Sequence, residues 1–224
     1  MKTVAFDTST KFLSIACFDG DEVKASFHED IGMGHSERLI PEIKKIIKKL
    51  DWDIKEVGLV CVGLGPGSFT GIRIAVSAAK GLAAVLTCKL TGVPTMDVIA
   101  DNASSLDGLV APFMDARKDK VYTCIYRSSE GKLNKISDYM LVDADEFLKE
   151  IKEPILLIGD GAEKYRKLLD AYDLARYDIS MDWYPKATDV GRRGIGMREF
   201  IPPEDLEPLY LHPKECNITQ SKKI

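Results

Sequence analysis

Residues 57–73 read VGLVCVGLGPGSFTGIR, and this stretch decides the fold. Its first part, 57–62, is an unbroken apolar run of strand length, which is typical of a parallel strand buried on both faces of a sheet. The glycine-rich exit predicts a tight corner, and Ser68 is a favourable N-cap for a helix over 69–86. A further strand is expected over 89–93. The stretch therefore predicts a strand–helix–strand unit of an α/β protein.

The glycine-rich corner has two interpretations. Backbone N–H groups at a helix N-terminus can bind an anion, so Gly65, Gly67 and Ser68 are candidate contacts for a nucleotide or another anion. The corner is not a P-loop, which needs a lysine, and it is not a dinucleotide-binding fingerprint, because Ser68 stands where the third glycine should be. A tight, well-capped turn from strand to helix is the simpler interpretation, and we favour it.

The residues before this unit predict an antiparallel meander of three strands, at 3–6, 13–18 and 23–28. The first strand ends in a polar turn whose residues are further candidate nucleotide or anion contacts: Asp7, Thr8, Ser9 and Thr10. An amphipathic helix is expected within 37–50, because apolar residues recur there at steps of three and four.

The same order of elements returns in the second half of the chain. A strand over 109–114 ends at Asp115, and a glycine-rich exit after 155–158 repeats the exit described above. This internal repeat predicts two stacked lobes, 1–104 and 105–224, each with a mixed sheet flanked by helices and with a cleft between them. The second lobe is expected to be the reduced one and to end in a Pro-rich tail.

Composition restricts the function. The formal net charge is -4 and no basic stripe is evident, so a partner is expected to supply most contacts to any RNA. The five cysteines are scattered without a CxxC pair, which predicts reduced thiols. His35 has Leu39, not a second metal ligand, one helical turn on, so neither a metal nor a cofactor is expected. Asp115 and Arg117 are expected to form a local salt bridge on a turn.

The apolar segments of the chain are too short for a membrane span, which needs about 20 residues. The N-terminal apolar stretch is also too short for a signal peptide. These two observations predict a cytoplasmic protein without a membrane partner.

The string GLGPGSFTGIR, followed by AAKGL at 78–82, resembles the signature of the TsaB family. Shorter motifs agree with it along nearly the whole chain: Asp7-Thr8-Ser9, His35-Ser36 with Leu39 and Pro41, Asp115-Ala116-Arg117 with Val121-Tyr122, Gly159-Asp160-Gly161 and Pro208-Leu209-Tyr210-Leu211. The resemblance implies a bacterial protein of the actin-like ATPase superfamily with two ribonuclease-H-like lobes. It implies an accessory subunit, not an enzyme, of the complex that transfers threonylcarbamoyl to adenosine 37 of tRNA.

The resemblance also implies partners. The subunit would dimerise with the catalytic subunit TsaD and activate it, join the ATPase TsaE, contact tRNA only through the complex, and form homodimers when alone. TsaB proteins lack the metal-binding histidine pair of TsaD, and Leu39 agrees with that. Because the family pairs through helices of the first lobe, four residues become candidate interface residues: Phe69, Arg73, Ser77 and Lys80.

Two other functions stay open. An autonomous ATP-binding phosphotransferase of the actin-like superfamily would use the cleft and Asp7. In those ATPases the strand-end turn reads Asp-x-Gly-Thr, and here Ser9 occupies the glycine position, where a Cβ crowds a phosphate. A glycoprotease-like metallopeptidase is the third hypothesis, against which the missing histidine pair argues. We rank the accessory subunit first.

Overall fold

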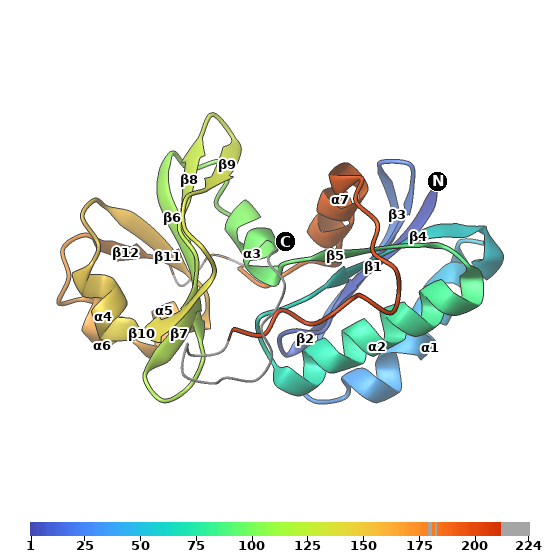
Figure 1. The fold of residues 1–224 in the computed structure, drawn as a ribbon, viewed down its shortest axis with the longest axis horizontal. Coiled ribbons are helices and arrows are strands. Elements are labelled where there is room, and N and C mark those ends of the chain that lie inside the picture. Colours follow the sequence, from blue (N-terminus) through green and yellow to red (C-terminus); the bar gives the residue numbers. More distant parts are fainter. Residues whose placement is uncertain (179–180, 182, 212–224) are drawn as a thin grey trace.

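The computed structural model describes residues 1–178, 181 and 183–211, and it shows an α/β molecule of two lobes. Each lobe is built on one mixed β-sheet with helices packed against it, and the lobes lie side by side along the long axis of the molecule (Figure 1). The fold class predicted from the internal repeat and the family resemblance is confirmed.

The first lobe holds a five-stranded sheet of order β3-β2-β1-β4-β5. Its strands are β1 (Lys2–Asp7), β2 (Phe12–Asp19), β3 (Glu22–Asp30), β4 (Val57–Gly63) and β5 (Lys89–Val93). The first three form the predicted antiparallel meander, whereas β1, β4 and β5 run parallel. An antiparallel meander followed by parallel strands with helical crossovers is the arrangement expected of a ribonuclease-H-like lobe.

Helices cover both faces of this sheet. One face carries α1 (His35–Lys49) and α2 (Phe69–Leu86), and the other carries α7 (Ala187–Met197), as Figure 1 shows. A short 3-10 helix, η1 (Ile54–Glu56), precedes β4. Helix α2 starts at its predicted N-cap, because Ser68 Oγ accepts a hydrogen bond from the Gly71 N–H at 3.3 Å. Among the described residues, α2 is long and apolar enough to cross a membrane, a criterion that core helices also meet, and it packs on β4.

The second lobe holds a seven-stranded sheet in which β10-β7-β6-β11-β12 form the main path and β8 pairs with β6 and β9. Its elements are β6 (Gly108–Asp115), β7 (Lys120–Thr123), β8 (Tyr126–Ser129), β9 (Lys132–Lys135), β10 (Met140–Asp143), α4 (Ala144–Lys149), β11 (Ile155–Ile158), α5 (Asp160–Lys164), α6 (Arg166–Leu169) and β12 (Ala175–Tyr177). Helix α3 (Thr95–Asp101) precedes it and lies between the lobes (Figure 1).

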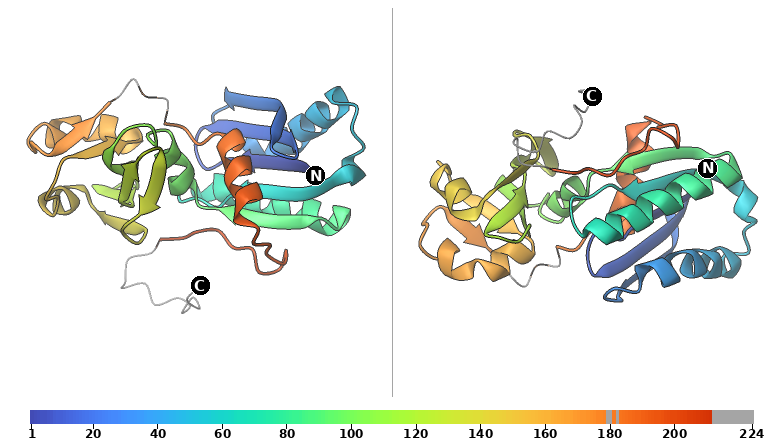
Figure 2. Two further views of the ribbon diagram at one scale, coloured as in Figure 1. Left: turned by 90° about the horizontal axis from the view of Figure 1, so that it is seen from above. Right: turned by 60° about the horizontal axis from the view of Figure 1, so that its bottom comes forward.

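The C-terminal part of the chain returns to the first lobe. Helix α7 packs on β1, β2 and β4, where Val190 is fully buried, and the Ala187 N–H donates to Ser14 Oγ at 2.7 Å. Beyond α7 the chain runs beside β5 and α2, where the Ile201 N–H donates to the Leu90 carbonyl at 2.8 Å (Figure 2). The predicted second lobe, 105–224, is therefore corrected: the described residues from 187 onward belong to the first lobe.

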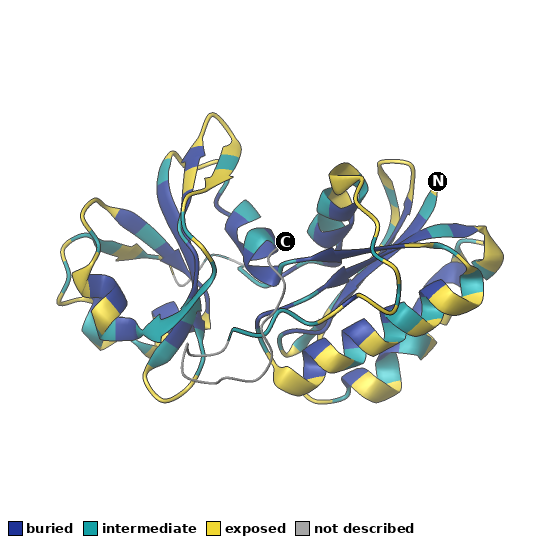
Figure 3. Ribbon diagram, viewed as in Figure 1, coloured by how far each residue is buried: buried dark blue, intermediate teal, exposed yellow. Residues whose placement is uncertain are grey.

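A polar network joins the lobes at α3. Asp97 Oδ1 accepts hydrogen bonds from the hydroxyls of Tyr126, at 2.5 Å, and Tyr139, at 2.7 Å. Arg193 of α7 pairs with Asp101 through two hydrogen bonds and lies 3.7 Å from Asp97. Because Tyr126 and Tyr139 come from the second lobe, the network fixes α3 and α7 to it. The main apolar cluster of each lobe lies on either side of this network, along sheets whose residues Figure 3 shows as largely buried.

Candidate functional site

Asp7, at the end of β1, is buried and fully engaged inside the protein. Only 1% of it is exposed. Its Oδ1 accepts hydrogen bonds from the Ser9 N–H at 2.7 Å and the Ser9 hydroxyl at 2.6 Å, and its Oδ2 accepts one from the Thr95 hydroxyl at 3.0 Å. Burial raises the pKa of Asp7, although these hydrogen bonds act in the opposite direction. The carboxylate thus links the β1–β2 turn to the start of α3.

The glycine-rich corner packs directly on the β1–β2 turn. The Ser68 N–H donates to the Ser9 carbonyl at 2.7 Å, and the Thr8 hydroxyl donates to the Gly71 carbonyl at 2.7 Å. A Cβ added at Gly67, whose φ is +158°, would lie 2.3 Å from the Ser9 carbonyl oxygen. Glycine is therefore required by close packing of two backbone segments. This agrees with the tight-corner interpretation of the motif.

The sequence-predicted anion contacts lie close together in the structure, and several of them form hydrogen bonds with one another. Asp7, Thr8 and Gly65 are buried and lie outside the lining of the cleft, so the structure leaves them no surface for a ligand. The remaining four of these candidates line the cleft: Ser9, Thr10, Gly67 and Ser68. For those four, contact with a nucleotide or anion stays a prediction.

The cleft between the lobes has a volume of about 730 Å³. Its wall includes Lys11, which pairs with Asp30 at 2.9 Å. Its far side includes Asp115 and Asp160 of the second lobe. Burial raises the pKa of Asp160, which accepts a hydrogen bond from the Asp115 N–H at 2.8 Å.

The expectation of a salt bridge between Asp115 and Arg117 is wrong, because Asp115 pairs with a different cation. Asp115 Oδ1 accepts the Arg117 backbone N–H at 2.9 Å, and its ion pair is with Lys164 at 2.8 Å. Burial alone would raise the pKa of Asp115, but the Lys164 ammonium and the other donors hold that pKa below its ordinary value. Arg117 lies in a hairpin turn with φ +65° and its side chain reaches the cleft.

No group of three or more histidine, cysteine, aspartate or glutamate side chains within the described residues could hold a metal ion. His35, the residue that the sequence singled out, is buried, and its Nε2 lies 3.2 Å from the Phe12 carbonyl oxygen. Leu39, one turn further along α1, is part of the core. His35 therefore joins α1 to β2.

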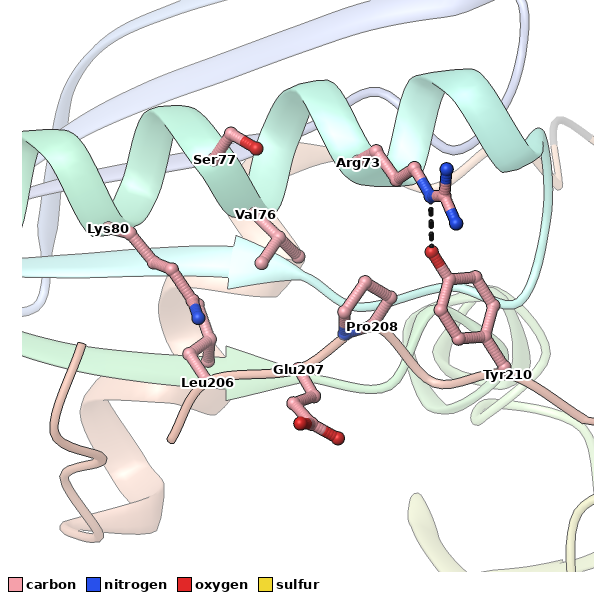
Figure 4. Close-up of a pocket in the computed structure, with 8 residues that line it drawn as sticks. All are labelled: Arg73, Val76, Ser77, Lys80, Leu206, Glu207, Pro208 and Tyr210. Carbon is pink, nitrogen blue, oxygen red and sulfur yellow. Dashed lines mark hydrogen bonds between the residues drawn. The ribbon is translucent and has the colours of Figure 1, made fainter. Parts of the chain in front are cut away.

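The four candidate interface residues lie along the outer side of α2. Phe69, Arg73 and Ser77 are exposed, and Lys80 is half-buried. They are not alone there, because the chain beyond α7 runs beside them and encloses a groove of about 370 Å³ (Figure 4). Within the groove the Arg73 Nε donates to the Tyr210 hydroxyl at 2.8 Å. A role of these residues in binding a partner stays a prediction.

Comparison with known proteins gives one consistent family. A model of the TsaD family, described as tRNA N6-adenosine threonylcarbamoyltransferase, matches residues 28–185. The tRNA threonylcarbamoyladenosine biosynthesis protein TsaB of Escherichia coli (strain K12) is 33% identical over 223 residues and covers 94% of each chain. The tRNA threonylcarbamoyladenosine biosynthesis protein TsaB of Bacillus subtilis (strain 168) is 33% identical over 173 residues, which are 76% of each chain.

The chain belongs to the TsaB family. The solved structure of YeaZ from Pseudomonas aeruginosa agrees, with a TM-score of 0.79 at 26% identity over 94% of this chain and 99% of that one.

In this TsaB-family chain, sequence reasoning missed two residues: the one that binds Asp7 and the one that binds Arg73. Thr95 binds Asp7 across 88 positions of sequence, and Tyr210 binds Arg73 across 137. The motif Pro208-Leu209-Tyr210-Leu211 was the one signal in the tail, because its apolar side chains can pack on a core. Nothing local indicated which residue it would meet.

Proposed function

We propose that this chain is a non-catalytic subunit of the complex that transfers threonylcarbamoyl to adenosine 37 of tRNA, and that it dimerises with the catalytic subunit TsaD and activates it. Membership of the TsaB family carries the proposal, since the relatives are named for threonylcarbamoyladenosine biosynthesis and one of them aligns over 94% of the chain. The ATPase TsaE joins the pair. The chain reaches tRNA only through the complex, works in the cytoplasm and forms homodimers when alone.

Local geometry supports docking rather than chemistry. The Ser68 N–H at the start of α2 donates to the Ser9 carbonyl, so this donor is not free for a phosphate. Asp7, the residue that an actin-like ATPase would need in its cleft, is sealed behind this contact. The outer side of α2 is open by contrast, with Phe69 55% exposed. Exposed large apolar side chains on a helix favour a protein partner.

The test is reconstitution of the modification. TsaD, TsaE, threonylcarbamoyl-adenylate and unmodified tRNA are incubated with and without this chain, and the modified nucleoside is measured by mass spectrometry. We expect omission of the chain to lower the initial rate by about tenfold or more, which corresponds to ~1.4 kcal/mol or more of activation free energy. Equal rates with and without the chain contradict the proposal.

An ATP-binding phosphotransferase is the second candidate, because a cleft of about 730 Å³ is large enough for a nucleotide. Calorimetric titration of the isolated chain with ATP and magnesium separates the two functions. Tight, magnesium-dependent binding of ATP together with its turnover would favour the phosphotransferase over the accessory subunit. We expect neither, because Asp7 has no access to the cleft.

A further inference from the structure

Helix α3 lies where the chain passes from the first lobe to the second. Two lobes joined in this way usually move relative to each other, unless the interface between them is large and apolar. Met96, Ile99 and Ala100 of α3 are fully buried in an apolar cluster with strands of the second lobe. The helix is therefore part of the core of the second lobe, and a movement of the lobes must break its contacts with the first.

The first turn of α3 is tied to the first lobe by one buried residue, Thr95. Its hydroxyl donates a hydrogen bond to Asp7 Oδ2 at 3.0 Å and accepts one from the Gly65 N–H at 3.0 Å. The Thr95 N–H also donates to the Gly65 carbonyl at 2.8 Å. These bonds join the start of α3 to the end of β1 and to the glycine-rich corner, at the point where the helix would otherwise hinge.

The last turn of α3 is tied to the first lobe by an ion pair. Arg193 of α7 donates two hydrogen bonds to the carboxylate of Asp101, the one from Nη2 at 2.7 Å. Because α7 packs on β1, β2 and β4, this pair anchors the far end of α3 to the first sheet (Figure 1). Directly after α3, the side-chain amide of Asn102 donates to the Trp183 carbonyl at 3.1 Å.

Trp183 and Tyr184 lie on the segment by which the chain returns to the first lobe. Their rings are stacked, with centres 4.1 Å apart. The centre of the Tyr184 ring is 4.2 Å from that of Phe12, the first residue of β2, and 5.4 Å from Lys11 Nζ. The return segment is thus bonded to α3 on one side and to β2 on the other. In the described part of the chain, both connections between the lobes are held by contacts with the first lobe.

We propose that α3 is a lock that holds the two lobes at a fixed angle, so that the cleft keeps its observed width whether or not a ligand occupies it. The lock consists of Thr95 on the first sheet, Arg193 on Asp101, and Asp97 on the tyrosines of the second lobe. Because these ties lie at separate places, a movement of the lobes must break several of them at once. Loss of one tie should raise the population of a second lobe arrangement by about tenfold or more.

The distance between the lobes can be measured in solution on the isolated chain. Ser36 of α1 and Glu163 of α5 are exposed, so Ser36→Cys and Glu163→Cys provide one nitroxide label on each lobe. Cys88→Ser and Cys216→Ser remove two native thiols, and the other three are buried. Labelled chains are diluted with unlabelled ones, and double electron–electron resonance gives the distribution of distances between the labels. We expect one narrow population, unchanged by ATP and magnesium at about 1 mM.

Variants then open the lock at one tie each. Thr95→Val removes the buried hydroxyl, whereas Thr95→Ser keeps it and should behave like the unaltered chain. Arg193→Gln removes the ion pair with Asp101. We expect Thr95→Val and Arg193→Gln each to show a second population of about 10% or more. Arg127→Gln is the matched control, because it breaks a two-bond pair with Glu153 inside the second lobe and should leave the distance unchanged.

Mobile lobes would overturn the proposal. They would appear as a broad or double distribution in the unaltered chain, or as a shift when ATP is added. Folded Thr95→Val and Arg193→Gln chains that keep one narrow distance would overturn it as well. If Thr95→Val does not fold by circular dichroism, Arg193→Gln decides, because the Arg193 side chain is 30% exposed and tolerates replacement.

The lock does not rest on the proposed function, because its test uses the isolated chain. Failure of the chain to support tRNA modification would leave a fixed distance between the lobes unexplained by that role but still measured. Mobile lobes in a chain that supports modification would remove only the lock. The two results are therefore distinguishable.

Discussion

Replacing Gly71 with alanine should destabilise the protein strongly. A Cβ at this position would lie 1.9 Å from the carbonyl oxygen of Thr8, which is backbone and cannot rotate away. Relieving such overpacking costs about 1–3 kcal/mol. The displacement also weakens two hydrogen bonds between α2 and the β1–β2 turn, worth about 1 kcal/mol each, while the helix propensity of alanine returns up to about 1 kcal/mol. We expect a net loss of about 2–4 kcal/mol in the free energy of unfolding.

Gly81 provides the control within the same helix. It is exposed, and a Cβ there would meet nothing within 4 Å. Gly81→Ala should therefore raise stability by about 0.5–1 kcal/mol through helix propensity and a less flexible unfolded chain. Urea unfolding followed by circular dichroism compares both variants with the unaltered chain. Equal midpoints for Gly71→Ala and Gly81→Ala would refute the close packing of α2 on the β1–β2 turn.

Three further predictions concern charge, the network between the lobes and ligand binding. Because the pKa of Asp7 is raised in the folded state, its stabilising contribution is fully present below the ordinary value of 3.8 and is lost as the pH rises through the raised pKa. The unaltered chain should lose stability relative to Asp7→Asn over that range in urea unfolding, and a constant difference would contradict this. Tyr126→Phe should cost about 1.5–3 kcal/mol, because its hydroxyl donates to the carboxylate of Asp97. Adding Tyr139→Phe should cost more than the sum of the single changes, since it leaves the shared oxygen without either donor, and strict additivity in a double-mutant cycle would be inconsistent with a shared acceptor. ATP at about 1 mM should shift the melting temperature of the isolated chain by less than about 1 °C, and a larger shift would favour the phosphotransferase.

Local patterns were sufficient for most of the first lobe. The apolar run 57–62 and the N-cap Ser68 gave a strand and a helix close to those observed, because periodicity and capping depend on neighbouring residues. The strands of the second lobe were harder to predict from the sequence. The chain between Lys120 and Ser129 is divided into two strands, β7 and β8, and the Ile125 N–H donates to Ser137 Oγ, where a ladder partner would otherwise lie. A side chain twelve residues away interrupts the strand, and no local pattern reports it.

By itself the sequence determined the two-lobed α/β plan, the TsaB signature and the tight corner before α2, since each follows from the order and spacing of neighbouring residue types. Only the tertiary structure decided that Asp7 is enclosed, that α7 rejoins the first lobe and that Tyr210 meets Arg73. These features depend on where distant segments return, up to 137 positions along the chain. Such returns are set by the packing of the whole core, which no local stretch of sequence specifies.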